Sequence, residues 1–225
     1  MRRIRITRDG RAPSDEGNDE FYSYIKDLAH HPVVLEMKKY PHHGTTSCYQ
    51  HCLNVSYYNY RICKYFGLDA RSAARAGMLH DLFLYDWHEH AALTGDHFHG
   101  MTHPKVSLRN AQRYFELSEL EKEIILRHMF PVTPVPPRHK EGFVICFTDK
   151  YCGSCETADG HRPKHVPRKF PLYTKILKIV FGQDYVFKDY DLSSVNAAKG
   201  GDFVTLRKRP SGKWKNVSDS RKRRR

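Results

Sequence analysis

The spacing of apolar residues along the chain predicts a series of helices. Between residues 19 and 30 the apolar positions recur at helical intervals, so a helix is expected there. Pro32 suits the first turn of a second helical stretch that reaches Tyr40. The Pro-His-His-Gly sequence at residues 41–44 is expected to break this stretch.

Two longer helices are expected next. Cysteines and aliphatic residues form an apolar stripe along residues 46–66, and Gly67 ends it. Asp69 is a good N-cap for a helix that should run through Leu84. One face of that helix carries small residues, which would let another helix approach closely.

The second half of the chain continues the pattern after a long loop expected at residues 85–102, and loops of this length are usually functional or mobile. Pro104 suits the first position of a helix that reaches Phe115. The remaining expected elements are a helix opened by the capping box of Ser118 and Glu121, an extended proline-rich segment at 131–137, and helices at 141–156 and 171–181, the last ended by Gly182. Because no convincing strand alternation is found in this body, the predicted fold class is all-α.

Charge divides the chain into a body and a tail. Of the net charge of +13, residues 199–225 carry +9, from eleven Lys or Arg and two Asp. This stretch has few large apolar residues, so we expect one helical domain over residues 19–185 and an extended or disordered basic tail over 186–225. Residues 1–18 should form a flexible arm, with a short strand expected at residues 4–7. The tail suits RNA, DNA or another polyanion as partner.

Composition also bears on location. No apolar run approaches the roughly 18 residues of a membrane span, and the start of the chain lacks the apolar stretch of a signal peptide. Six cysteines without a secretory signal indicate free thiols, so a cytoplasmic protein without a membrane partner is expected. Cys152 and Cys155 have zinc or redox spacing, but without a second pair we interpret them as core residues.

Histidines and aspartates on apolar faces or at helix starts are the main candidates for chemistry. An adjacent pair, His80 and Asp81, lies in an apolar run, where each group needs a partner. A core histidine bonded to its neighbour or to the backbone is the alternative. Similar residues recur at intervals of about one helix and one turn, and a bundle would bring them to one level. The full set, which suits two metals sharing a carboxylate better than one structural zinc, is His51, His80, Asp81, His103, His128 and Asp149.

This ordered set resembles the HD-domain superfamily of metal-dependent phosphohydrolases. The neighbourhoods at residues 45–51, 76–81 and 147–150 match as well, and the resemblance covers roughly residues 40–157. With two histidines between the HD pair and the last aspartate, the chain is similar to the dinuclear, YqeK-like branch. The resemblance implies an HD-type helical bundle.

The resemblance also implies roles for these residues. His51, His80, Asp81 and Asp149 match the ligands of a first metal. His103 and His128 match a second metal, with Asp81 as the bridge and the His80–Asp81 pair as the catalytic core. The expected cofactors are two divalent ions, iron or manganese first, with magnesium, cobalt, nickel or zinc also compatible. They would activate a water that hydrolyses a phosphate ester or anhydride, of a nucleotide or another small phosphorylated metabolite.

Substrate-binding residues are less clearly marked. Several dinuclear members carry a lysine just after the HD pair, where this chain has Leu84 and Tyr85. The acid that protonates the leaving group is therefore sought among Asp86, His88, His97 and His99. Residues that could bind the substrate are Lys105, Arg109, Arg138, His139, Lys150, Trp87 and His97. The alternative function is a nucleic-acid-associated HD protein, a nuclease or an RNA- or DNA-binding module that uses the basic tail.

Overall fold

Two antiparallel helices form the centre of the molecule in a computed structural model, which describes residues 16–95, 97–159, 171–182, 189–192, 206–208 and 214–216. Helix α3 (Cys48–Tyr65) packs along α4 (Ala70–Leu79). A Cβ atom at Gly77 would lie 2.7 Å from the Cα of Ser56, so this close approach requires glycine. The prediction that small residues allow a close helix contact is confirmed.

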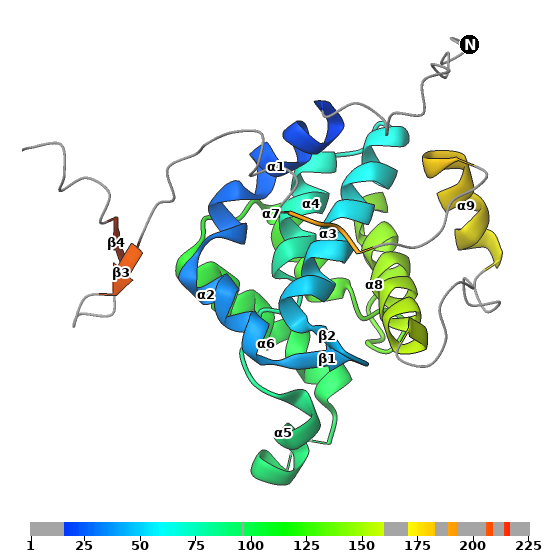
Figure 1. Cartoon of the computed structure of the whole chain (residues 1–225). Helices are drawn as coiled ribbons and strands as arrows, with labels where there is room; N and C mark the ends of the chain where they lie inside the picture. Colours follow the sequence, from blue (N-terminus) through cyan, green and yellow to red (C-terminus); the bar gives the residue numbers. More distant parts are fainter. Residues whose placement is uncertain are drawn as a thin grey trace, which may run out of the picture.

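The other helices surround this pair (Figure 1). α1 (Glu16–Ala29) and α7 (Glu119–Arg127) pack on α4, while α8 (Lys140–Asp159) packs on both α3 and α7. α6 (His99–Tyr114) contacts α7, and α9 (Pro171–Phe181) contacts α3. The described part of the chain is thus predominantly helical, as predicted.

Local sequence signals set several helix ends, those of Asp69 and Ser118 as expected. The side chain of Ser47 accepts a hydrogen bond from the backbone N–H of Gln50 at the start of α3, and Asp69 caps α4 in the same way. Ser118 and Glu121 form the predicted capping box of α7. Cys152 and Cys155 on α8 are buried and carry free thiols, which confirms their interpretation as core residues.

Three predicted boundaries are wrong. α4 ends at Leu79 and does not reach Leu84. The φ of Leu84 is 64°, which is incompatible with a helix. The predicted loop at 85–102 contains α5 (Trp87–Thr94), capped by Asp86 and ended by Gly95 in the left-handed conformation. α6 begins at His99, so Pro104 lies inside this helix and not at its first position.

The segment expected to be a simple break after Tyr40 is a small hairpin. It follows α2 (Pro32–Leu35) and the 3-10 helix η1 (Glu36–Lys39) and consists of β1 (Pro41–His43) paired antiparallel with β2 (Thr46–Ser47). The proline-rich segment is also not fully extended, because the carbonyl of Met129 accepts hydrogen bonds from Val132 and Thr133 and forms a turn.

The ends of the chain differ from expectation where they are described. α1 starts at Glu16, inside the predicted arm 1–18, and the strand expected at residues 4–7 lies outside the described residues. Tyr190, from the predicted tail, is buried against Phe21, and its backbone N–H donates to the side chain of Asn54. Further along, β3 (Leu206–Lys208) pairs antiparallel with β4 (Trp214–Asn216). Among the described residues, no helix has both the length and the apolar character needed to cross a membrane.

Candidate metal centre

The first predicted group of ligands converges where α3, the end of α4 and α8 meet. His51 Nε2 lies 3.1 Å from Asp149 Oδ1, and His80 Nε2 lies 3.3 Å from Asp81 Oδ2. The distance from His80 Nε2 to Asp149 Oδ1 is 3.6 Å. One ligand atom from each of these four residues can be chosen so that all lie within 4.8 Å of one another, close enough for one ion to reach them all.

The second predicted group meets on the other oxygen of Asp81. His103 Nε2, from α6, lies 3.1 Å from Asp81 Oδ1, and His128 Nε2, which follows α7, lies 3.6 Å from the same oxygen. The two histidine nitrogens are 2.9 Å apart. Asp81 therefore faces the first group with Oδ2 and the second group with Oδ1, the arrangement expected of a bridging carboxylate. The structure brings all six predicted ligands together.

Backbone carbonyls orient three of the four histidines. Nδ1 of His80, His103 and His128 lies 2.8 Å from the carbonyl of Gly77, His99 and Ile125, respectively. A carbonyl oxygen can only accept, so Nδ1 carries the hydrogen in each ring. In the neutral rings, Nε2 then directs a lone pair at the aspartates, as in metal-binding histidines.

His51 is oriented by a carboxylate instead. Its Nδ1 lies 2.7 Å from Glu156 Oε2, and the side-chain amide of Asn54 donates to Glu156 Oε1 over 2.9 Å. Glu156 is buried. A carboxylate behind a histidine is a common outer partner in metal centres. Sequence reasoning missed Glu156, although it stands two helical turns after Asp149, on the same face of α8.

Imidazoles and carboxylates shift one another's pKa values in the centre: burial would lower the pKa values of His51 and His80, but the neighbouring carboxylates hold both well above the usual range. Burial would raise the pKa of Asp81, but the nearby imidazoles of His80, His103 and His42 hold it well below its usual range. Burial lowers the pKa of His128 to about 3, aided by the neighbouring His80 and His103. At neutral pH this gives buried carboxylates and at least one buried neutral imidazole.

The donor set fits divalent metal ions. His80 Nε2 and Asp81 Oδ1 are buried without a hydrogen-bond partner in the described structure. Such atoms are costly to bury unless something else binds them. Imidazole nitrogens combined with carboxylate oxygens suit iron, manganese and related transition metals. The group of four and the group of three, which share Asp81, would each hold one ion.

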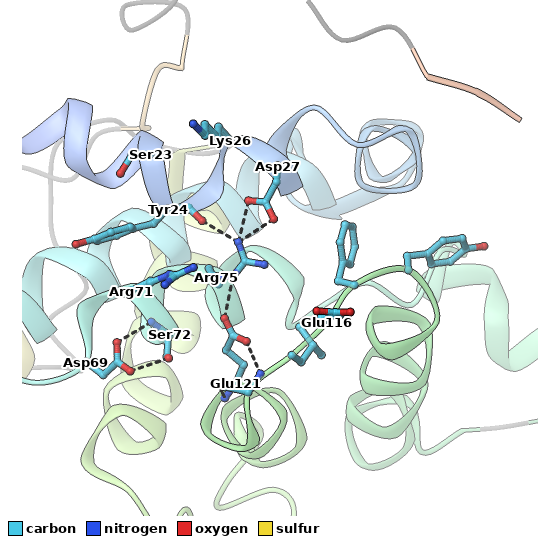
Figure 2. Close-up of a pocket in the computed structure, with 14 residues that line it drawn as sticks. Ser23, Tyr24, Lys26, Asp27, Asp69, Arg71, Ser72, Arg75, Glu116 and Glu121 are labelled. Atoms are coloured by element: carbon cyan, nitrogen blue, oxygen red, sulfur yellow. Dashed lines mark hydrogen bonds and ion pairs between the residues drawn. The ribbon is translucent and has the colours of Figure 1, made fainter. Parts of the chain in front are cut away.

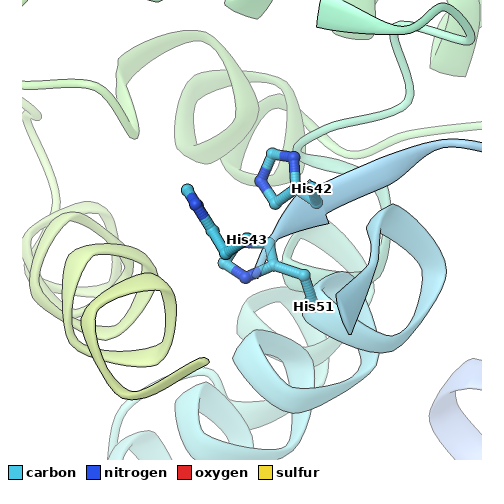
Figure 3. A group of neighbouring side chains, drawn as sticks. All are labelled: His42, His43 and His51. Carbon is cyan, nitrogen blue, oxygen red and sulfur yellow. The ribbon is translucent and has the colours of Figure 1, made fainter. Parts of the chain in front are cut away.

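A second histidine cluster adjoins the first group. His42 and His43 of β1 lie beside His51 of α3 (Figure 3). Three neighbouring histidines could hold a third ion, but both nitrogens of His51 are already in contact with carboxylates, Nδ1 with Glu156 and Nε2 with Asp149. His42 is of interest for another reason, because its Nε2 lies 3.1 Å from Asp81 Oδ2. Sequence reasoning missed it by treating residues 41–44 only as a helix break.

Two predicted substrate-binding residues lie beside the centre. Lys150 Nζ is 3.3 Å from the carbonyl of His128 and 3.9 Å from Asp149 Oδ2, and the side chain is part-exposed. The ring of Trp87, at the start of α5, lies 6.4 Å from that of His42 and stacks on His99 at 5.6 Å.

The structure does not bring the other five to the metal ligands. Lys105 and Arg109 are exposed on the face of α6 roughly opposite His103. Arg138 and His139 are exposed and contact Glu123 instead. The backbone N–H of Arg138 donates to the Glu123 carboxylate, and His139 forms a 3.6 Å ion pair with it. His97 is exposed. Within the described residues, none of the five forms a recorded hydrogen bond or ion pair with the six ligands.

A pocket of about 880 Å³ lies elsewhere, between α1, α4 and the start of α7 (Figure 2). Arg75 stands at its centre, where it pairs with Asp27 and Glu121 and donates to the carbonyl of Tyr24. None of the six metal ligands lines this pocket. Since its central cation is already paired by protein groups, we assign the pocket no role.

Comparison with protein families agrees with the geometry. Residues 48–153 match the family model described as the HD domain. This range contains all six ligands, whereas His42 and Glu156 lie outside it. Among curated proteins and solved structures, no significant match was found. Over these residues the chain is similar to the HD domain, a family that generally comprises metal-dependent hydrolases.

Proposed function

We propose that the protein is a metal-dependent phosphohydrolase with a two-ion centre of the dinuclear, YqeK-like kind. The observation that carries the proposal is the pair of ligand groups joined by Asp81, one on each carboxylate oxygen. The orientation of every ligand histidine, with Nδ1 on an outer acceptor and Nε2 directed inward, supports it. A core that only packed would not need four such rings around two carboxylates.

The protein groups would hold and orient what the ions act on. Bound divalent ions supply Lewis acids for phosphoryl oxygens and lower the pKa of a water that attacks phosphorus. Lys150, part-exposed beside Asp149, is placed to attract the remaining charge of the phosphoryl group. This chemistry suits a phosphate ester or anhydride, and we propose a nucleotide or another small phosphorylated metabolite as substrate.

The acid that protonates the leaving group is best sought next to the second ligand group, His103 and His128. His99 stacks on His103 at 4.5 Å and accepts or donates a hydrogen bond at 3.1 Å with the hydroxyl of Tyr85. Among the four acids proposed from sequence, and within the described part of the chain, it is the ring of His99 that contacts a metal ligand. His88 instead pairs with Asp86 at 3.0 Å on the exposed side of α5. We therefore assign the acid role to His99.

The test is metal content followed by turnover. The chelated protein is reconstituted with Mn²⁺ or Fe²⁺ and analysed for bound metal, with about two ions per chain expected. It is then screened for phosphate release from nucleotides and sugar phosphates. Asp81→Ala should abolish turnover, because that carboxylate serves both groups. A parent chain without any transition metal after reconstitution would refute the proposal.

A nucleic-acid-associated function remains a second candidate because of the +9 charge of residues 199–225. Binding through such a tail should weaken steeply as salt rises. Removing residues 199–225 should then abolish affinity for RNA or DNA and leave hydrolysis of small phosphate esters intact. If small-molecule turnover were lost with the tail, the division between catalytic body and binding tail would be wrong.

A further inference from the structure

His42 contacts the carboxylate that joins the two ligand groups. It lies on β1, outside the HD-domain match, with only 7% of its surface exposed. Its Nε2 is 3.1 Å from Asp81 Oδ2, the oxygen that faces the first group. Since this oxygen would also bind the first ion, His42 must be either another ligand or a hydrogen-bond donor to the bridge.

The nitrogen of His42 that carries the ring hydrogen, Nδ1 or Nε2, decides between these roles. Each ligand histidine has an acceptor at Nδ1, a backbone carbonyl or Glu156, which fixes its hydrogen there. His42 Nδ1 is buried and has no hydrogen-bond partner in the described structure. A buried nitrogen without a partner costs about 1–3 kcal/mol whether it is a donor or an acceptor, so Nδ1 is unsatisfied in either tautomer. A hydrogen on Nδ1 would in addition leave two bare acceptors, Nε2 and Asp81 Oδ2, facing each other at 3.1 Å.

The hydrogen of a neutral His42 therefore belongs on Nε2, where it points at the carboxylate. We propose that His42 is a positioning residue that donates this hydrogen bond to Asp81 Oδ2 and so fixes the rotation of the bridging carboxylate. This role rests on the proposed two-ion function. The carboxylate oxygen has two lone pairs, one for the first ion and one for His42. With its plane fixed, the other oxygen stays directed at the second group.

Two glycines let the hairpin reach this position. Gly44 has a φ of +57°, and a Cβ there would lie 2.9 Å from the carbonyl oxygen of Glu156. A Cβ at Gly153 would lie 2.7 Å from His43 Nε2. The contact at Gly44 is with backbone, so a side chain there would push the hairpin away from α8 and withdraw His42 from Asp81, whereas a side chain at Gly153 would displace the ring of His43.

The experiment compares two amide variants of His42 in the full chain. The side-chain amide of His42→Gln can donate near the position of Nε2, whereas that of His42→Asn is one methylene shorter and does not reach Asp81. Binding of Mn²⁺ to the chelated proteins is measured by calorimetry, and circular dichroism checks that each variant is folded. His42→Asn should lose tenfold to a hundredfold in affinity, the range typical of outer partners. His42→Gln should stay within about threefold of the parent.

His43→Gln is the matched control on the same strand, and it should bind Mn²⁺ like the parent. If His42→Gln binds as weakly as His42→Asn, the imidazole nitrogen is itself a ligand and the positioning role is overturned. Loss of one metal equivalent in His43→Gln would overturn it in favour of a third ion. Parental affinity in both His42 variants would show that Asp81 needs no support. The outcomes for the two His42 variants leave the two-ion function standing, a third ion would revise the number of ions, and a parent chain that binds no Mn²⁺ refutes both proposals.

Discussion

Replacing Glu156 by glutamine should weaken metal binding without unfolding the protein. Both oxygens of this buried carboxylate are used, Oε2 by His51 Nδ1 at 2.7 Å and Oε1 by the amide of Asn54 at 2.9 Å. Glutamine has the same size but only one acceptor oxygen. Whichever way its amide is turned, an NH2 group faces either the ring N–H of His51 or the amide of Asn54.

The magnitude follows from the bond that is lost. A hydrogen bond to a charged group contributes about 1.5–3 kcal/mol. When the hydrogen bond from His51 to Glu156 stabilises the metal-bound state by this amount, its loss lowers the affinity for the first ion by about tenfold to a hundredfold, since tenfold corresponds to about 1.4 kcal/mol. Loss of the carboxylate charge behind His51 acts in the same direction, because it makes Nε2 a weaker donor to a cation.

Calorimetric titration of the chelated protein with Mn²⁺ measures this effect. Ser154→Ala is the control, because Ser154 lies on the same helix and its hydroxyl donates a hydrogen bond to the carbonyl of Lys150, away from Glu156 and His51. Thermal unfolding followed by circular dichroism checks the fold of both variants. A Glu156→Gln protein that binds Mn²⁺ as tightly as the parent would refute the reasoning.

Four further outcomes are expected. His128→Ala should retain the fold and one ion per chain by elemental analysis, because only the second group loses a ligand; retention of two ions would contradict the six-ligand centre. Trp87→Ala should change KM or kcat about tenfold, roughly 1.4 kcal/mol, with metal content unchanged, and parental kinetics would exclude α5 from the substrate site. Gly77→Ala should lower the free energy of unfolding in urea by about 1–3 kcal/mol, since its Cβ would meet Ser56 at 2.7 Å. Burial lowers the pKa of His43 from 6.5 to about 4. As the pH falls below 6.5, His43 therefore becomes protonated in the unfolded chain while it stays neutral in the folded one, which lowers the free energy of unfolding. The metal-free parent should therefore lose about 1–2 kcal/mol more stability than His43→Gln between pH 7 and pH 5, and equal losses would contradict this.

The sequence predicted the long helices and the six clustered residues because both leave periodic signals. An apolar stripe marks α3, and caps such as Asp69 mark where helices begin. Helix α5 was missed because its eight residues are too few to show a stripe, although Asp86 before it and Gly95 after it have the residue types of a helix start and end.

The residues that support the ligands were harder to predict, since their role depends on contacts between distant segments. Glu156 acts on a histidine 105 positions away in sequence. His42 reaches Asp81 only because a three-residue strand folds back on α8, and such a short strand has no alternation to recognise. The exposed cations Lys105 and Arg109 were proposed from charge alone, which does not indicate the direction of a side chain.

The two ligand groups are unequal, and this inequality bears on how the chain would respond to metal supply. The first group has Asp149 and the shared Asp81, with Glu156 behind His51, whereas the second has two imidazoles and only the shared carboxylate. Divalent ions should therefore fill the first position before the second. At intermediate metal concentrations most chains would hold a single ion. At the lowest concentrations, where the first position is also largely empty, turnover that needs both ions would rise with the square of the metal concentration. The rate of turnover would then depend on the concentration of free metal as well as on that of the phosphorylated substrate.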